Sequence, residues 1–394
     1  MWLSIAGLAF AALLTASPAF AQTQQSPAKP DREKKETLSD KARRLAKETQ
    51  IVERLNGSVD GWYPRLGGMP TGGGIALGPG YRTHVGGERI LLDMSATVSH
   101  RAYKAADIKT RWVRAWQNRV ELWTNFRLQD FPEEDFFGVG LKSSNSTRTS
   151  YRLESADLST VAMVHLRPWL LVGVDAGVFN PAIGHGADPA IPSIEDLFGD
   201  SQAPGLANQP HFRHSTMFTE IDYRDERGNP RSGGYLKAAF GVWDDRGVDE
   251  FDFHRFDGEA AQFVPIATKA HVVAGRLGIS YVNNADGDRV PFYVLPYVGG
   301  SDTLRGFREF RFKDENVFWL NLEYRWAALR YANLAVFADA GEVRHDWQDI
   351  GLGGLKSSYG VGVRFNTDKR VFARIDFAVG DEGPQAYVKF GPSF

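Results

Sequence analysis

An arginine and two acidic residues are the strongest candidates for chemistry in this chain. Arg305 lies in the segment 299–307, Gly-Gly-Ser-Asp-Thr-Leu-Arg-Gly-Phe, whose paired glycines permit a sharp backbone reversal. Glu323 and Asp339 follow in two segments where polar and apolar residues alternate, and both fall on the polar side. Because a planar guanidinium can bridge two carboxylates, we predict an ion-pair network that holds the Arg305 loop. The alternative is an exposed arginine on an outer loop.

Patterns for catalysis or metal binding are weak elsewhere. The chain has no cysteine, which excludes thiol catalysis and thiolate metal sites. Ser99 and His100 are adjacent, so on a strand they point to opposite faces, and the spacing of His211 and His214 has the same result. No Gly-x-Ser-x-Gly elbow occurs. The net charge of −2 shows no nucleic-acid footprint. The residues therefore predict no enzyme, metal, cofactor or nucleic-acid partner.

From Trp62 onward, apolar residues recur with a period of two, which is typical of strands between two environments. In 371–380 every odd-numbered residue is apolar, whereas Arg374 and Asp376 fall on the other face. Aromatic residues make up 12% of the chain and 41 residues are glycine, yet the mean hydropathy is −0.32. Outer-membrane barrels have this composition, because their strands alternate lipid-facing apolar and lumen-facing polar residues, whose hydropathies cancel in the average. A soluble sandwich would have shorter strands and a polar outer face.

We predict an all-β protein, a 16-stranded antiparallel transmembrane β-barrel. With both termini periplasmic, the long connections all fall on the outer side, where such barrels carry their long loops. These connections are 132–148, 181–211, 284–314 and 342–356. The expected strands are 62–69, 73–83, 89–99, 102–114, 118–131, 149–165, 168–180, 212–225, 231–246, 250–266, 269–283, 315–327, 331–341, 357–366, 370–380 and 385–394.

The predicted barrel spans residues 62–394, and the chain before it has two segments. Residues 1–21 predict a signal peptide, because an apolar run ends in Ala19-Phe20-Ala21, a small-x-small cleavage site. A membrane anchor is the alternative, but the run is short. Residues 22–61 predict a polar periplasmic lead-in, either one amphipathic helix or a solvated linker.

The two ends of the predicted barrel are rich in strand-weakening residues. Proline and glycine are frequent in 62–74, and Gly391 and Pro392 lie in the last expected strand. Proline cannot donate a ladder hydrogen bond and glycine weakens strands. We therefore predict a weak seam between first and last strands that can open sideways. A flexible start to an ordinary short strand is the alternative.

The segment 299–307 follows Pro291-Phe292-Tyr293 and precedes the pattern Phe337-x-Asp339-x-Gly341. Together these motifs resemble the inward-folded loop of the Omp85 superfamily, in its BamA/TamA-like surface antigen (D15) branch. The resemblance covers most of the chain after Trp62. It implies that a loop tip lies inside the barrel, held by partners on the next two strands. The tip residues are Leu304, Arg305, Gly306 and Phe307, and the lumen partners are Glu323, Asp339, Phe337 and Gly341.

The end of the chain also resembles a family feature. Apolar residues alternate through the last expected strand, as in the terminal strand signal that the outer-membrane assembly machinery recognises, with Phe390 and Phe394 as its aromatic residues. Relatives usually carry periplasmic POTRA domains before the barrel. The lead-in is too short for even one, since an independent domain needs at least about 50 residues.

The resemblance implies a barrel of the bacterial outer membrane that assists the insertion or translocation of proteins, or of lipids, without a cofactor. A loop pinned by Arg305 and a weak seam would provide the mechanism. Implied partners are outer-membrane lipid and lipopolysaccharide, the assembly machinery during biogenesis, and a separate periplasmic protein. Two other functions remain open. One is a passive diffusion pore with a charged constriction; the other is a lipid-modifying barrel enzyme with a serine, histidine and carboxylate near the outer rim.

Overall fold

A computed structural model describes residues 60–67, 69, 73–86, 89–115, 119–284, 287–351, 353–367, 369–392 and 394. The chain separates into the units Met1–Val59 and Asp60–Phe394, and all described residues belong to the second. The predicted signal peptide, and all but the last two residues of the lead-in, lie outside the described residues.

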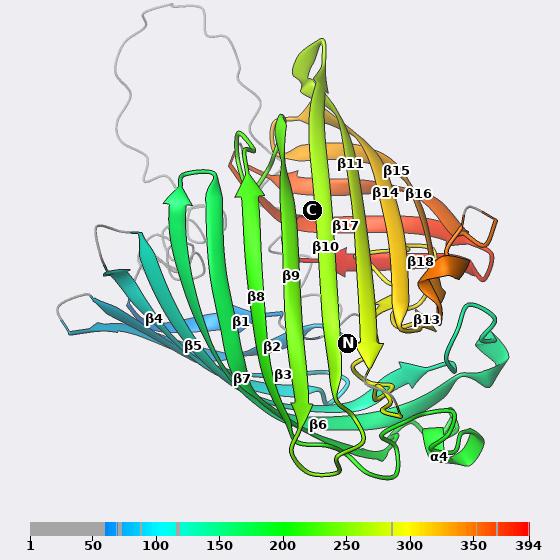
Figure 1. The fold of residues 1–394 in the computed structure, drawn as a ribbon. Coiled ribbons are helices and arrows are strands. Elements are labelled where there is room, and N and C mark those ends of the chain that lie inside the picture. Colours follow the sequence, from blue (N-terminus) through cyan, green and yellow to red (C-terminus); the bar gives the residue numbers. More distant parts are fainter. Residues whose placement is uncertain are drawn as a thin grey trace, which may run out of the picture. The chain divides into compact units, whose positions relative to one another are not determined.

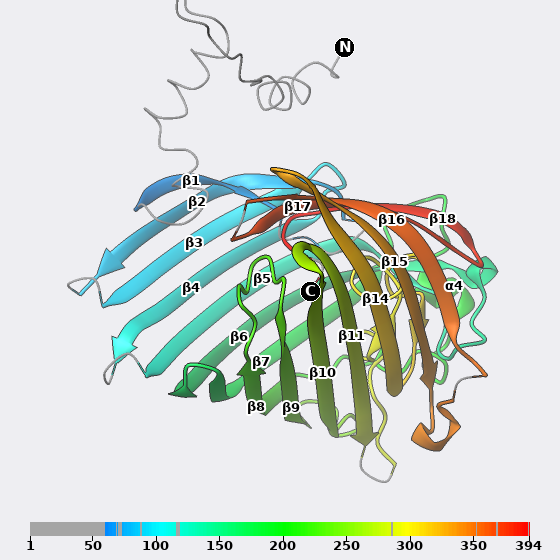
Figure 2. The same cartoon turned by 90° about the horizontal axis from the view of Figure 1, so that it is seen from above.

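Sixteen strands form one antiparallel sheet, which confirms the predicted 16-stranded transmembrane β-barrel. The sheet curls round, and each strand lies beside the one that precedes it in the sheet, with β14 following β11 (Figures 1 and 2). Its strands are β1 Gly61–Leu66, β2 Ala76–Val85, β3 Ile90–Ser99, β4 Lys104–Ala115, β5 Val120–Phe136, β6 Thr149–Arg167, β7 Leu170–His185, β8 Phe212–Asp222, β9 Gly233–Asp245, β10 Phe253–Ile266, β11 Thr268–Asn284, β14 Asn316–Leu329, β15 Ala332–Arg344, β16 Lys356–Asn366, β17 Val371–Gly380 and β18 Gly383–Lys389.

The two faces of each strand meet different environments. On β14, Leu322 and Tyr324 are exposed on the outer face, whereas Asn321 and Glu323 are buried on the lumen face. In a bilayer, hydrocarbon covers the apolar outer face and the polar side chains point into the lumen. This alternation explains how a chain of negative mean hydropathy forms a membrane-spanning sheet.

Several strand boundaries differ from those expected. β5 and β7 continue five residues beyond their predicted ends, to Phe136 and His185. The last strand was predicted to reach residue 394, and this is wrong: β18 ends at Lys389. Gly391 has a φ of +106°, a left-handed conformation that takes the chain out of the strand.

The long connections all leave the same end of the sheet. They span 137–148, 186–211, 285–315 and 345–355, and each joins an odd-positioned strand of the sheet to the next one. At the opposite end most connections have four residues or fewer, and Ala267 alone separates β10 from β11; the longest is 223–232, between β8 and β9. Long loops mark the extracellular end of an outer-membrane barrel, and Figure 1 shows α4 and β13 at this end.

The outer loops pack on one another through an apolar cluster. Phe136 and Tyr151 come from β5 and β6, Ile194 from the short helix α4 (Ile194–Leu197), and Phe292 from the loop 285–315. The rings of Phe136 and Phe292 lie 5.0 Å apart. Two long loops are therefore joined outside the lumen. No helix in the described part of the chain is long and apolar enough to cross a membrane.

Neighbouring residues of β9 offer a test of the two faces. Phe240 is half-exposed on the outer face, and Ala239 lines a lumen cavity. We expect Phe240→Arg to lower the free energy of unfolding by about 2–4 kcal/mol, the cost of a cation at a lipid-facing position near the bilayer midplane. Ala239→Arg should cost much less, because its charge stays in water. Urea unfolding in lipid vesicles measures both, and equal losses would contradict the assignment of faces.

Candidate functional site

The loop 285–315 between β11 and β14 reverses sharply at its tip. A short hairpin of β12 (Tyr297–Val298) and β13 (Phe312–Lys313) leads into and out of it. Gly299 and Gly300 have φ values of +122° and +85°, which favour glycine. The Gly300 N–H then donates to the Phe307 carbonyl at 3.0 Å. The segment 299–307 is therefore a compact turn with its own internal hydrogen bonds.

Arg305, at this tip, is 2% exposed and lies between two carboxylates. Its Nε and Nη2 donate to the two Asp339 oxygens at 2.9 and 2.7 Å. Its Nη1 donates to Glu323 Oε2 at 2.8 Å, and its backbone N–H donates to Asp339 at 3.1 Å. The structure thus brings together the three residues from which the sequence predicted a network, in a bidentate geometry that strengthens charge-assisted bonds.

Phe337 lies beneath the Arg305 guanidinium. The guanidinium carbon is 3.4 Å from the centre of the ring, well inside the range of a cation–π contact. The ring occupies space left by Gly360, since a Cβ there would approach Phe337 Cζ to 2.6 Å. The two carboxylates at its edge and the Phe337 ring against its face therefore fix the plane of the guanidinium.

Asn321 and Ser358 complete the shell of Asp339. Asn321 Nδ2 donates to Asp339 Oδ1 at 2.8 Å and to the Thr303 carbonyl at 2.6 Å. Ser358 Oγ donates to Asp339 Oδ2 at 3.4 Å. Asp339 therefore accepts from the loop and from the barrel wall, which orients its carboxylate toward Arg305.

Glu323 links the loop to further arginines of the wall. Arg364 Nη2 donates to Glu323 at 2.9 Å and its Nη1 to Asp376 at 2.5 Å. Arg325 Nε donates to Glu323 at 2.8 Å. We call this set the Arg305 network: it has three arginines and three carboxylates, Arg305, Arg325, Arg364, Glu323, Asp339 and Asp376.

The balance of charge matters because these groups are buried. Burial of Arg305 disfavours its charged form, but hydrogen bonds and charge attraction from Asp339 and Glu323 outweigh this, so its pKa is raised above the ordinary value. Arg305 therefore stays cationic at any physiological pH. A buried charge is tolerated where it is paired and hydrogen-bonded.

The other tip residues contact the strands that end the sheet. Gly306 lies against β16 and β17: a Cβ on it would come within 2.4 Å of Ser358 Cβ and 2.6 Å of the Gly380 nitrogen. Tyr387 of β18 donates its hydroxyl to the Phe307 carbonyl. Leu304 and Phe307 are fully buried in one apolar cluster with Trp319. The tip therefore touches every strand from β14 to β18.

Gly341, predicted among the lumen partners, lies on the same face of β15 as Phe337 and Asp339. It pairs with Trp319 in the ladder of β14 and β15, and a Cβ on it would approach the Phe318 carbonyl to 2.8 Å. The glycine that makes room for Gly306 is Gly380. Which wall glycine meets the loop depends on the curvature of the sheet, and the local pattern Phe337-x-Asp339-x-Gly341 does not contain it.

Sequence reasoning also missed part of the network. Arg364 falls on the polar face of an alternating strand, so the period of two was a usable signal for it. No such signal marked Gly360, Gly380 or Tyr387, because their roles arise from contacts between distant segments.

Outer residues of the loop are held by separate ion pairs. Arg311 donates to Glu382, in the turn between β17 and β18, at 2.7 Å and to Ser143 Oγ at 2.8 Å. Lys313 is 1% exposed, and burial lowers its pKa to about 8, although the Glu134 and Glu309 carboxylates oppose this shift. The loop is thus bound to the wall and to the outer connection 137–148 as well as through its tip.

Phe390 and Phe394, the predicted terminal signal, do not share a face. Phe390 is 57% exposed, just beyond the end of β18. Phe394 is buried in a cluster with Phe263, and the Arg325 guanidinium lies 4.8 Å from its ring. The turn at Gly391 separates the two residues. Recognition of this segment by an assembly machinery stays a prediction.

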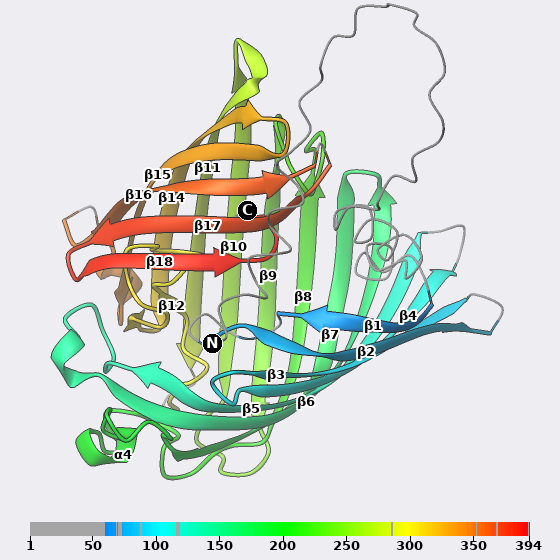
Figure 3. The same cartoon turned by 180° about the vertical axis from the view of Figure 1, so that it is seen from behind.

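The edges of the sheet are β1 and β18, which both face the viewer in Figure 3. They have six and seven residues and are the shortest strands of the sheet. No β1–β18 ladder is found among the residues that the structure describes. A Cβ on Gly67 would lie 3.7 Å from the Phe390 ring, so the two edges approach each other there.

Histidines predicted to be poor metal ligands have other neighbours. His214 stacks on Trp243 with ring centres 4.8 Å apart, and His211 Nδ1 lies 3.2 Å from Asn180 Oδ1. Within the described ranges, no group of three or more histidines, aspartates and glutamates is placed to hold a metal ion.

Comparisons with known proteins agree with this fold. Residues 205–394 match the model of the Omp85 superfamily domain. The structure of BamA from Haemophilus ducreyi lacking POTRA domains 1–3 is similar, with a TM-score of 0.62 at 12% identity over 84% of this chain and 69% of that one. CdiB from Escherichia coli gives a TM-score of 0.55 at 11% identity over 83% of this chain and 61% of that one.

Fold and site together define a transmembrane β-barrel of the bacterial outer membrane with a long loop bound inside its lumen. This chain is an Omp85-family barrel. The predicted family and location are therefore confirmed.

Arg305→Ala tests the network directly. Its removal leaves Glu323 and Asp339 buried without their shared cation, so we expect the free energy of unfolding to fall by about 3–5 kcal/mol. Arg308→Ala, three residues further along the same loop, is the matched control, because Arg308 is exposed; such surface changes stay within about 0.5 kcal/mol. The temperature at which the folded band is lost on gels reports both variants. Equal temperatures for Arg305→Ala and wild type would contradict the network.

Proposed function

We propose that this barrel assists the insertion or translocation of proteins at the outer membrane. The observation that carries the proposal is the Arg305 network, which binds a long loop inside the lumen of an Omp85-family barrel through charges that are fully paired. A passive pore needs a constriction, but it does not need a loop tip that contacts five consecutive strands.

The loop acts on the strands next to the seam. Gly306 fits against Gly380 of β17, and Phe307 accepts a hydrogen bond from Tyr387 of β18. A shift of the loop must therefore move the last strands or break these contacts. In this mechanism the Arg305 network holds β14–β17 as one unit while β18 serves as the mobile edge.

The seam supplies the route. A strand edge presents unpaired backbone N–H and C=O groups, which form a template for an incoming strand. Short edges at β1 and β18 lower the number of hydrogen bonds that must break before the barrel opens sideways. The incoming chain gains hydrogen bonds and apolar burial as it folds, so the process requires neither nucleotide nor cofactor.

This function requires partners in the outer membrane and in the periplasm. Outer-membrane lipid and lipopolysaccharide surround the barrel, and the outer-membrane assembly machinery inserts it. A separate periplasmic protein would deliver the unfolded substrate, which is a protein in this proposal; lipid transfer is the alternative cargo.

A crosslink across the seam tests the route. The chain has no cysteine, so Gly67→Cys with Phe390→Cys creates a unique pair for a cleavable bifunctional maleimide. We expect wild type in vesicles to accelerate the folding of an added unfolded outer-membrane protein over empty vesicles. Crosslinking should abolish most of this acceleration, and cleavage should restore it. Single-cysteine variants treated with the same reagent are the controls.

The possible failures are distinct. Full acceleration by completely crosslinked barrel would eliminate the lateral route. No acceleration by wild type would eliminate the insertion function itself.

Single-channel recording separates this function from a passive pore. We expect small, flickering conductance from wild type, because the loop occupies the lumen, and larger or unstable conductance from Arg305→Ala. Arg308→Ala should behave as wild type. Large and steady conductance that neither substitution changes would establish the passive pore.

A further inference from the structure

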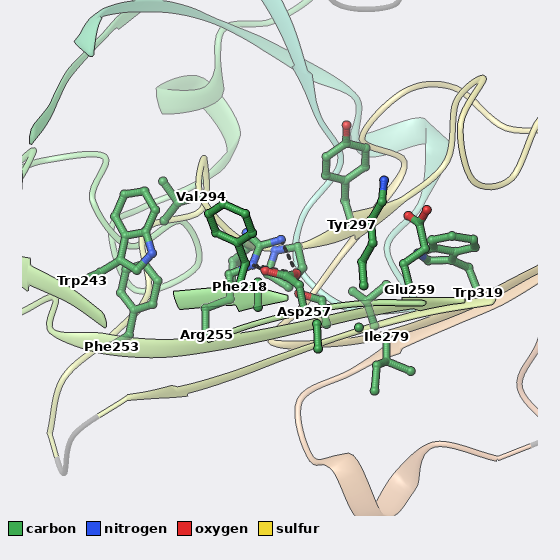
Figure 4. A pocket seen from close by; sticks show the side chains of 18 of the residues that line it. Phe218, Trp243, Phe253, Arg255, Asp257, Glu259, Ile279, Val294, Tyr297 and Trp319 are labelled. Atoms are coloured by element: carbon green, nitrogen blue, oxygen red, sulfur yellow. Dashed lines mark hydrogen bonds and ion pairs between the residues drawn. The ribbon is translucent and has the colours of Figure 1, made fainter. Parts of the chain in front are cut away.

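A second site lies between the loop and the opposite wall. A cavity of about 670 Å³ is bounded by residues of β6 to β11 and of β14, and by the loop segment 293–297 (Figure 4). Its volume falls within the range of about 300–1,000 Å³ typical of ligand pockets. None of the residues of the Arg305 network lines it, so it is a separate feature of the lumen.

One end of the cavity is aromatic. Trp243 and Phe253 stack with ring centres 5.5 Å apart and planes at 9°, and Val294 of the loop lies close to them in Figure 4. Phe218 is placed beside this group, toward the middle of the cavity. Flat rings of this kind offer an apolar surface that favours an aromatic or aliphatic side chain.

The remainder of the lining is charged, and arginines pair three of its four carboxylates. Arg255 pairs with Asp257 at 2.8 Å, Arg276 pairs with Glu259 at 2.8 Å, and Arg227 pairs with Glu220 at 3.5 Å. The fourth carboxylate, Asp157, forms no ion pair with an arginine or lysine of the described residues. A ligand with a basic group would supply a partner for Asp157, because opposite charges attract strongly where water is partly excluded.

The lid of the cavity belongs to the loop that Arg305 holds. Leu295 packs in an apolar cluster with Phe253 and Phe212, which fixes the loop over the aromatic end. Thr303, two residues before Arg305, also lines the cavity. The complete cavity therefore exists only while the loop is in place.

We propose that this cavity binds an extended polypeptide segment that carries an aromatic side chain next to a basic one. The aromatic side chain lies against Trp243, Phe253 and Phe218, and the basic side chain faces Asp157. The inference rests on the proposed function, since an insertion or translocation barrel receives unfolded chains. It adds to that function a site in the lumen where such a chain is held.

Equilibrium dialysis of isotope-labelled peptides against the barrel in lipid nanodiscs tests this site, because nanodiscs avoid detergent in the cavity. The probe is a flexible glycine–serine peptide that contains one Phe-Lys pair. Peptides with Ser-Lys or Phe-Glu in its place test the two halves of the site. We expect each replacement to weaken binding by about tenfold, and added salt to weaken the Phe-Lys peptide most.

Matched variants locate the binding. Trp243→Ala should weaken the Phe-Lys peptide by about tenfold, whereas Phe240→Ala, on the outer face of the same strand, should leave it unchanged. Ala239→Trp fills the cavity from its wall without removing the stacked rings and should also weaken binding. The folded band on gels shows which variants retain the barrel.

Several outcomes would overturn the inference. One is equal binding of the Phe-Lys and Ser-Lys peptides, and another is equal loss in Trp243→Ala and Phe240→Ala. Binding of laurate that depends on Trp243, with no binding of peptides, would instead assign the cavity to lipid. If wild type accelerates folding in vesicles but binds no peptide, this inference fails while the proposed function stands. Peptide binding without any acceleration of folding would mean that the binding site exists but the proposed insertion function fails.

Discussion

The buried charge of Arg305 is the constraint on which the rest of the lumen depends. An isolated guanidinium inside a barrel wall would be strongly unfavourable, so carboxylates must meet it at hydrogen-bonding distance. Asp339 and Glu323 do so from adjacent strands, and Phe337 closes the remaining face. These partners can reach the guanidinium only if the loop enters the lumen. The geometry of one ion-pair network thus determines the path of about thirty residues of loop.

The network extends beyond the loop because each carboxylate must itself be balanced. Glu323 draws in Arg364 and Arg325, and Arg364 in turn requires Asp376 on the next strand. The ion pairs therefore extend from β14 to Asp376 on β17. Gly306 packs against Gly380 of that same strand, so the loop also contacts the last strands sterically. At the opposite edge, β1 pairs with β2, and Tyr63 of β1 donates its hydroxyl to Asp93 of β3. The β18 side of the seam is therefore supported by the loop from within, and the β1 side is supported by its neighbouring strands.

Alternation along each strand was sufficient to predict the barrel, the number of its strands and the end that carries the long loops. The same alternation placed Glu323, Asp339, Arg374 and Asp376 on the lumen face before any contact was known. It did not predict where β18 ends. A strand pattern continues through Phe390 and Phe394 in the sequence, but the left-handed backbone at Gly391 sends Phe394 into the lumen. The contact between Gly306 and Gly380 was not predicted either, since no local pattern joins these two residues.

By itself the sequence determined the class of fold and the chemical types that face the lumen, because the period of a strand assigns each side chain to one of two faces. Tertiary structure decided which lumen residues meet. Gly360 is small where its ladder partner Phe337 needs room. Gly380 is small where Gly306 of the loop approaches, and this second contact depends on how sixteen strands curve around the loop. Curvature is a property of the whole sheet, so it brings together residues that no local pattern connects.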